Sequence, residues 1–144
     1  MKNTTRFVVS LVALLTVCAA TAADDPIAQR RQIMTKNSRA ERAANSVILG
    51  KYFAEKAIAA MKTLEDNLTV FPTLFPEGSD KGDTHASPAI WENMDDFKSL
   101  AAKLVTDAKA AQAAAANGQD AFTLAFQVVE TDCAGCHAKY ELGN

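Results

Sequence analysis

The chain has 144 residues, the length of one domain, with a hydrophobic content of 49% and a charged content of 22%. The formal net charge is −2 and the sequence contains no long basic stretch, so we expect no nucleic-acid partner. Alanine is abundant, whereas glycine and proline number only 6 and 4, a balance that favours helices over strands.

The N-terminal segment has the three parts of a secretory signal peptide. Two cationic residues precede an apolar run, and small residues then offer a cleavage site at Ala20-Thr21-Ala22. The apolar run is too short for a permanent membrane-spanning helix. We therefore expect residues 1–22 to be a cleaved signal peptide and residues 23–144 to form one domain in the periplasm, with no stable membrane span. A retained anchor, or lipid attachment at Cys18, is the alternative.

Capping residues and apolar periodicity predict four helices in the rest of the chain. The first covers residues 26–49, because Asp25 is a good N-cap, Pro26 suits the first helical position and Gly50 suits the end. The second covers residues 52–68. Its buried stripe is expected to comprise Phe53, Ala57, Met61, Leu64 and Leu68.

A loop over residues 69–87, long for a helical bundle, separates the second and third helices. The third helix is expected to begin with Ser87 as N-cap and Pro88 in the first position, and to continue to residue 116. The fourth covers residues 120–140. No alternating strand pattern competes with these helices, so the sequence predicts an all-α, antiparallel up-down-up-down four-helix bundle.

The segment Cys133-Ala-Gly-Cys136-His137 is a C-x-x-C-H motif, which is typical of the attachment site of one covalently bound haem c. Residues at i, i+3 and i+4 share a helix face. Both sulfurs can therefore reach the vinyl groups of one haem, and His137 can ligate the iron from the same side. A thiol redox pair, a zinc site and a structural disulfide are the alternatives. The all-α context and the lack of a second ligand pair disfavour the first two.

The second axial ligand is left open by position alone. In an up-down-up-down bundle, the motif lies at the end where the first helix begins and where the second helix meets the third. Met34, Met61 and Met94 all lie near that end, as does His85 in the loop. Each methionine is equally explained as a core residue, and the histidine as an exposed loop residue.

A C-x-x-C-H motif close to the carboxyl end of a four-helix chain resembles the cytochrome c-prime family, over essentially the whole mature chain. Three other segments are similar to that family's patterns. They are Arg30 to Asn37 in the first helix, Leu74-Phe-Pro76 together with Ser87-Pro-Ala-Ile-Trp91 before and in the third, and Cys133 to Tyr140 at the end.

Within the family, the resemblance implies that the first-helix position occupied by Met34 decides the subtype. A methionine there is similar to the low-spin cytochrome c-556 branch, in which His137 and Met34 would both ligate the iron. A non-bonding residue would leave the iron five-coordinate and open to small gases. By the same resemblance, Arg30 would lie near a haem propionate, where opposite charges attract.

Two residues depart from the family pattern. Arg31 stands where the family often has glutamine, and an alignment that puts Gln32 there would instead turn Thr35 toward the iron. Glu141 stands where a basic residue is common, which changes the electrostatics near the motif.

These features together predict a periplasmic carrier of single electrons with a His/Met-ligated haem. With both axial positions filled there is no open site for a substrate, so we do not expect an enzyme. Unidentified redox proteins are the expected partners, and a homodimer through the first two helices is a further expectation from the resemblance. The alternatives are a five-coordinate protein that binds nitric oxide and a haem-free thiol redox protein.

Overall fold

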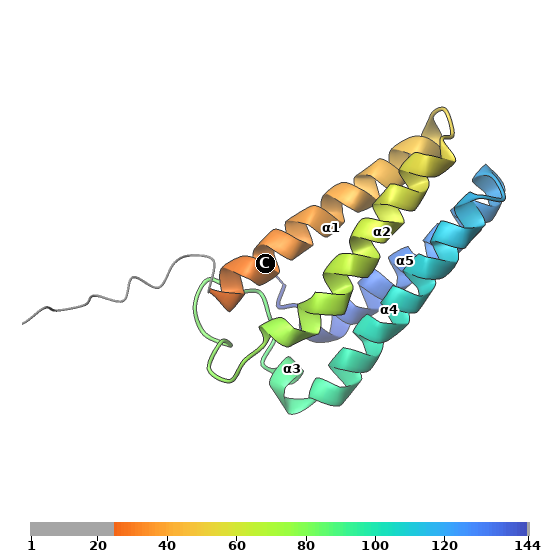
Figure 1. Ribbon diagram of the computed structural model, residues 1–144. Coiled ribbons are helices and arrows are strands. Elements are labelled where there is room, and N and C mark those ends of the chain that lie inside the picture. The colour runs from red at the N-terminus through yellow and green to blue at the C-terminus, as the bar shows by residue number, and fades with distance from the viewer. Residues whose placement is uncertain (1–24, 144) are drawn as a thin grey trace, which may run out of the picture.

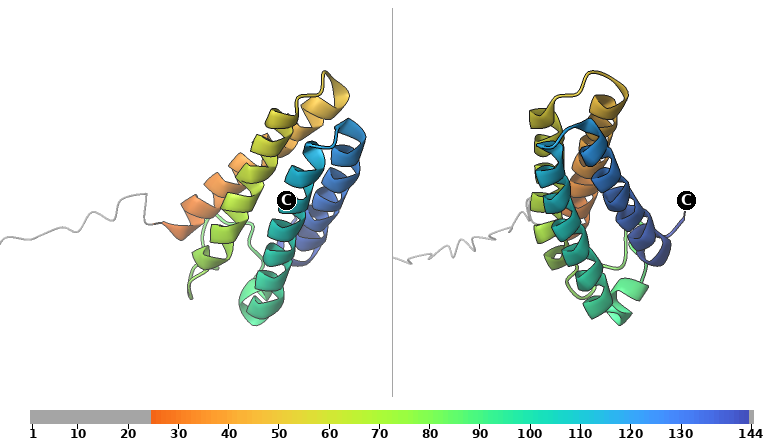
Figure 2. Two further views of the ribbon diagram at one scale, coloured as in Figure 1. Left: turned by 45° about the vertical axis from the view of Figure 1, so that its right-hand side comes forward. Right: turned by 90° about the vertical axis from the view of Figure 1, so that its right-hand side faces the viewer.

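The computed structural model describes residues 25–143, so the expected signal peptide lies outside the described residues. The helices in this part of the chain are α1 (Pro26–Leu49), α2 (Ala54–Val70), the short 3-10 helix η1 (Phe71–Leu74), α3 (Ala89–Glu92), α4 (Met94–Ala115) and α5 (Gln119–Tyr140). The four long helices lie side by side, with the α1–α2 and α4–α5 turns at the same end of the molecule (Figures 1 and 2). The predicted all-α four-helix bundle is confirmed.

The start of α1 follows from local sequence chemistry. The Asp25 side chain accepts a 2.9 Å hydrogen bond from the backbone N–H of Ile27, and Pro26 occupies the first helical position. Such an N-cap satisfies a donor that the helix itself leaves unpaired. The helix ends at Leu49, where the Gly50 N–H still bonds to the Ser46 carbonyl. The predicted bounds of this helix are confirmed.

The predicted start of the second helix, at residue 52, is wrong by two residues. Phe53 has an extended backbone and α2 begins at Ala54. The Tyr52 hydroxyl instead donates a 2.7 Å hydrogen bond to the Ala115 carbonyl at the end of α4. This contact joins the two turns at that end of the bundle, a use of Tyr52 that helical periodicity does not reveal.

The third predicted helix is broken into two. Asn93 leaves the helical conformation, with φ −131° and ψ 44°, and separates α3 from α4. Its side chain donates to the Ala89 carbonyl, while the Trp91 indole donates to the Pro76 carbonyl in the loop. The predicted start at Pro88 is one residue early, since α3 begins at Ala89 with Pro88 as its N-cap, and the Ser87 hydroxyl accepts from the Ala89 N–H. The break lets α3 serve as a separate unit that packs against the loop.

The core is aromatic at the end of the bundle where α3 lies. Phe97 of α4 packs edge-on against Phe75 and Tyr140, with ring centroids 4.8 and 5.3 Å apart, and Phe71 packs edge-on against Phe75 at 5.1 Å. Edge-to-face pairs of this kind are favoured by the ring quadrupole. These rings form a rigid wall at the end of the bundle that carries the candidate site.

The loop before α3 is fixed to the C-terminal end of α5. The Ser87 N–H donates to the Tyr140 carbonyl at 2.9 Å, and the Leu142 N–H donates to the His85 carbonyl at 2.7 Å. These two bonds make one antiparallel bridge between Ala86 and Glu141.

Among residues 25–143, no helix is long and apolar enough to cross a membrane.

Candidate functional site

Two adjoining pockets open between α1 and α5 near the end of the bundle that carries α3. The loop-side pocket, of about 160 Å³, reaches Arg30, Tyr140 and the loop before α3. The helix-side pocket, of about 290 Å³, extends along α1 toward Glu41. The residues that line both pockets are Met34, Phe71, Phe97, Cys136, His137 and Glu141. We call the two pockets together the α1–α5 cleft.

The cysteines of the motif lie on the wall of this cleft. Both thiols are half-buried and free, and Cys136 lines both pockets whereas Cys133 lines the helix-side pocket. Burial raises the pKa of Cys133 to about 12, and it also raises the pKa of Cys136. Since the thiolate is the reactive form in disulfide exchange, thiols that stay protonated at neutral pH are poorly suited to a redox pair.

His137 lines both pockets and lies one turn before Glu141 on the chain. Its Nδ1 is 3.5 Å from Oε2 of Glu141, and both side chains are about half-exposed. A carboxylate near one ring nitrogen favours an imidazole orientation that leaves the other nitrogen for a ligand. The sequence pattern marked Glu141 only as a departure; its four-residue spacing from His137 was the available signal for this contact.

The structure separates the four candidates for the second axial position. Met34 of α1 lines both pockets, together with Cys136 and His137 of α5. Met61 is fully buried in the core of the bundle, and neither Met61 nor Met94 lines the cleft. His85 is exposed and lines the loop-side pocket only.

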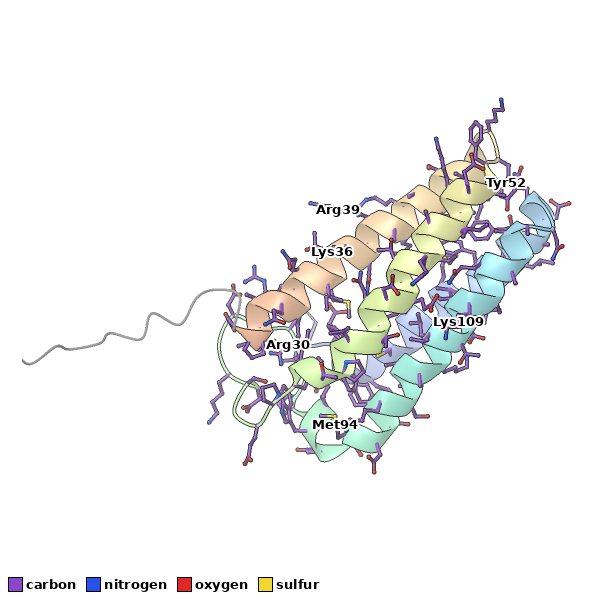
Figure 3. The ribbon with its side chains drawn as sticks, in the orientation of Figure 1. Arg30, Lys36, Arg39, Tyr52, Met94 and Lys109 are labelled. Atoms are coloured by element: carbon purple, nitrogen blue, oxygen red, sulfur yellow. The ribbon has the colours of Figure 1, made fainter. Side chains whose placement is uncertain are left out.

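Arg30 lies at the loop-side pocket, but its guanidinium is bound by the loop. Its Nη atoms donate to the Ser79 hydroxyl at 3.0 Å, the Ser79 carbonyl at 2.7 Å and the Leu74 carbonyl at 3.1 Å. The group also lies over the Phe75 ring, 4.5 Å from its centroid, and Arg30 is only 4% exposed. Figure 3 shows Arg30 near the start of α1. Burial lowers the pKa of Arg30, although nearby Asp25 opposes this shift. Sequence reasoning missed this anchoring role and the buried Ser79.

Tyr140 contributes a second contact that the sequence did not reveal. It is buried at the loop-side pocket, and its hydroxyl donates a 2.6 Å hydrogen bond to Asp96 at the start of α4. This bond to a carboxylate raises the pKa of Tyr140 to about 12 and lowers the pKa of Asp96. The hydrogen bond joins α5 to α4 next to the motif.

The donor set of the cleft fits a haem. Two thiols, an imidazole and a thioether are the protein groups that attach and ligate haem iron in c-type cytochromes, and here they come from two facing helices. Apolar rings of Phe71 and Phe97 line both pockets, as a large apolar macrocycle requires.

Comparison with known proteins agrees with this chemistry. The family described as Cytochrome C' matches residues 25–141. Cytochrome c-556 of Agrobacterium tumefaciens (strain II Chrys) is 47% identical over 91 residues, which cover 63% of this chain and 74% of that protein. The solved structure of cytochrome c' from Rhodopseudomonas palustris superposes with a TM-score of 0.79 at 28% identity, over 83% of this chain and 98% of that one.

A further solved cytochrome c', described as having an unusual ligand-controlled dimer dissociation, superposes with a TM-score of 0.77 at 26% identity, over 82% of this chain and 95% of that one. The homologues bind covalently attached haem c, and Cys133 and Cys136 fit the attachment motif. Because the family model matches residues 25–141, this chain belongs to the cytochrome c' family, whose haem c proteins carry electrons or bind gases and are generally not enzymes.

Proposed function

We propose that the protein is a periplasmic carrier of single electrons, with haem c attached through Cys133 and Cys136 and ligated by His137 and Met34. The observation that carries this proposal is that Met34 of α1 lines both pockets of the α1–α5 cleft, together with His137 of α5. Met61 and Met94 line neither. The similarity to cytochrome c-556 of Agrobacterium tumefaciens supports the methionine-ligated branch.

In this mechanism haem c supplies one chemical property, an iron that accepts and releases one electron. The chain supplies the rest. Cys133 and Cys136 hold the group by thioether bonds, so it is not lost between partners. The Glu141 carboxylate faces Nδ1 of His137 at 3.5 Å, and the Phe71 and Phe97 rings give both pockets an apolar lining. A site whose ligands are held in place needs little rearrangement when its charge changes, which suits electron transfer.

Arg30 belongs to the proposal as a cofactor-binding residue at the loop-side pocket. It brings a permanent positive charge to the pocket that Met34 and His137 also line. Its bonds to Ser79 and Leu74 keep that charge in place. The fixed positive charge attracts a propionate carboxylate, while the Nη atoms already donate to Leu74, Ser79 and Thr84.

The test is an optical spectrum of the exported protein in both redox states, combined with substitution of Met34. Low-spin bands with a sulfur–iron band in the oxidised protein, lost in Met34→Ala, support the proposal. Met94→Ala is the matched control, because Met94 is half-buried near the same end but does not line the cleft. A high-spin spectrum in the parent protein, or a Met34→Ala spectrum equal to the parent's, would instead identify a five-coordinate, gas-binding protein or a different ligand.

Self-association through α1 and α2 is the partner proposal that we attach to this function. An open groove on this face is lined by exposed Ala43 and Ala59 and by Lys36, Arg39 and Lys56. Figure 3 shows Lys36 and Arg39 on α1. The dimer dissociation described for a solved cytochrome c' supports a dimer in this family. Pairing two copies of this basic face brings like charges together, so we expect a dimer that strengthens as salt screens the charges. Sedimentation at low and high salt tests this; a monomer at all concentrations and salts contradicts it.

A further inference from the structure

Two asparagines form a chain of hydrogen bonds that ends at the sulfur of Met34. Asn67 of α2 donates from Nδ2 to Oδ1 of Asn37 at 2.7 Å, and Asn37 of α1 donates from Nδ2 to Sδ of Met34 at 3.8 Å. Asn37 is three residues after Met34, so both side chains lie on the face of α1 that lines the helix-side pocket. Asn67 lies behind them and lines neither pocket.

We propose that Asn37 and Asn67 are positioning residues that hold the Met34 thioether in its ligating orientation and so keep the haem closed to external ligands. This inference rests on the proposed function, because it concerns Met34 as an iron ligand. Neither asparagine is proposed to touch the iron.

Asn67 occupies the acceptor end of the Asn37 amide. An asparagine side chain presents an oxygen acceptor at one end and an N–H donor at the other. The N–H of Asn67 occupies the oxygen of Asn37, which leaves the Asn37 N–H for the sulfur. Without Asn67, the Asn37 amide is free to turn, and its oxygen can then face the sulfur, where two sets of lone pairs repel each other.

The Met34 side chain needs such support because methionine has three rotatable bonds and packs without a strong orientation of its own. A thioether sulfur has two lone pairs, so one can accept the N–H of Asn37 while the other is given to a metal. Met34 is half-buried and packs against the apolar core. A hydrogen bond to the sulfur therefore adds an orientation that packing does not supply.

A purely structural explanation is that the two amides satisfy one another between α1 and α2, as buried polar groups usually do. The chain also contains an amide that bridges two helices away from the cleft. Asn45 of α1 is also half-buried and donates from Nδ2 to Oε1 of Glu130 on α5 at 3.3 Å. Asn45 does not line the α1–α5 cleft. Asn45→Leu therefore reports the loss of stability when an amide hydrogen bond between helices is removed away from Met34.

The experiment is an optical titration of the oxidised, exported holoprotein with imidazole, which competes with Met34 for the sixth position. We expect Asn67→Leu to bind imidazole about tenfold more tightly than the parent, the effect of losing one hydrogen bond. Asn67→Asp keeps the shape but accepts instead of donating, so it should bind imidazole at least as tightly as Asn67→Leu. Asn45→Leu should match the parent within about twofold. Thermal unfolding of each variant verifies that the bundle is intact.

The outcomes separate this inference from the proposed function. Met34→Ala must bind imidazole more tightly than the parent; if it does not, Met34 is not the ligand and the proposed function fails. If Met34→Ala binds more tightly but both Asn67 variants behave like Asn45→Leu, the two amides serve only helix packing and the inference is overturned. Tighter binding in both Asn67 variants, with Asn45→Leu unchanged, supports it.

Discussion

The Tyr140 hydroxyl on α5 donates a 2.6 Å hydrogen bond to Oδ2 of Asp96 on α4, and this bond fixes the two helices together beside the haem-attachment motif. Tyr140 is buried and its ring packs edge-on against Phe97. The Lys139 ammonium also donates to Asp96, at 3.2 Å. The pair therefore connects the motif-bearing helix to the aromatic end of the core.

Removing this hydroxyl tests how much the connection stabilises the fold. Tyr140→Phe keeps the ring and its packing, so we expect a decrease of about 1 kcal/mol in the free energy of unfolding, measured by denaturant titration. Tyr52→Phe is the comparison, because it removes a tyrosine hydrogen bond at the other end of the bundle, where the hydroxyl donates to the Ala115 carbonyl. A Tyr140→Phe protein as stable as the parent would show that water replaces this bond without cost.

The same bond predicts how stability depends on alkaline pH. The pKa of Tyr140 is raised to about 12 in the folded protein, mainly by its hydrogen bond to Asp96. In the unfolded chain it returns to about 10. A raised pKa contributes stability that is present below about pH 10 and is lost as pH rises toward 12. The parent should therefore lose stability over this range more steeply than Tyr140→Phe; equal slopes would contradict the prediction.

Neighbouring arginines allow a matched test of the loop anchor. Arg30→Met keeps an unbranched side chain but leaves the buried Ser79 and the Leu74 carbonyl without a donor, so we expect a loss of about 3 kcal/mol and faster proteolysis between residues 75 and 88. Arg31→Met removes only an exposed ion pair with Asp83 and should cost less than about 1 kcal/mol. Similar losses of stability in both variants would contradict the role of Arg30 as the anchor of the loop.

We expect alanine substitutions of the three cysteines to differ in their effect on haem attachment. Replacing both Cys133 and Cys136 by alanine removes both thioether bonds, so haem should be extracted from the purified protein by acid and organic solvent. Either single variant keeps one bond and should retain the haem. Cys18→Ala serves as the control, because we expect that residue to be removed with the signal peptide. Covalent haem that survives the double substitution would refute attachment at this motif.

We expect substitution of Glu141 to change the reduction potential of the haem. Its carboxylate lies 3.5 Å from Nδ1 of His137 and favours the more positive, oxidised iron. Glu141→Gln should raise the potential by roughly 20 to 40 mV, the equivalent of an exposed ion pair worth less than 1 kcal/mol. Glu55→Gln changes the net charge equally but lies in the first turn of α2, at the opposite end of the bundle. Equal shifts in the two variants, measured by spectroelectrochemistry, would mean that only net charge acts.

The helices and the attachment motif could be predicted from the sequence because both depend on residues close together in the chain. The N-cap at Asp25 and the spacing of Cys133, Cys136 and His137 are properties of one helix turn. The break at Asn93 was missed, since neighbouring residues have good helical periodicity. The interruption accompanies a bond from Trp91 to Pro76, fifteen residues away. The start of α2 was missed for a similar reason, because Tyr52 contacts Ala115 on another helix.

The all-α bundle and the haem-attachment motif at its C-terminal end could be read from local patterns, since apolar periodicity and i, i+3, i+4 spacing involve residues close together in the chain. Which of Met34, Met61 and Met94 lines the cleft with His137 depends on how α1, α2 and α4 pack. Among the described methionines it is Met34. The tertiary structure also decided that Arg30 holds a loop about fifty residues further along the chain. Such contacts depend on how helices pack against each other, and no local pattern records that packing.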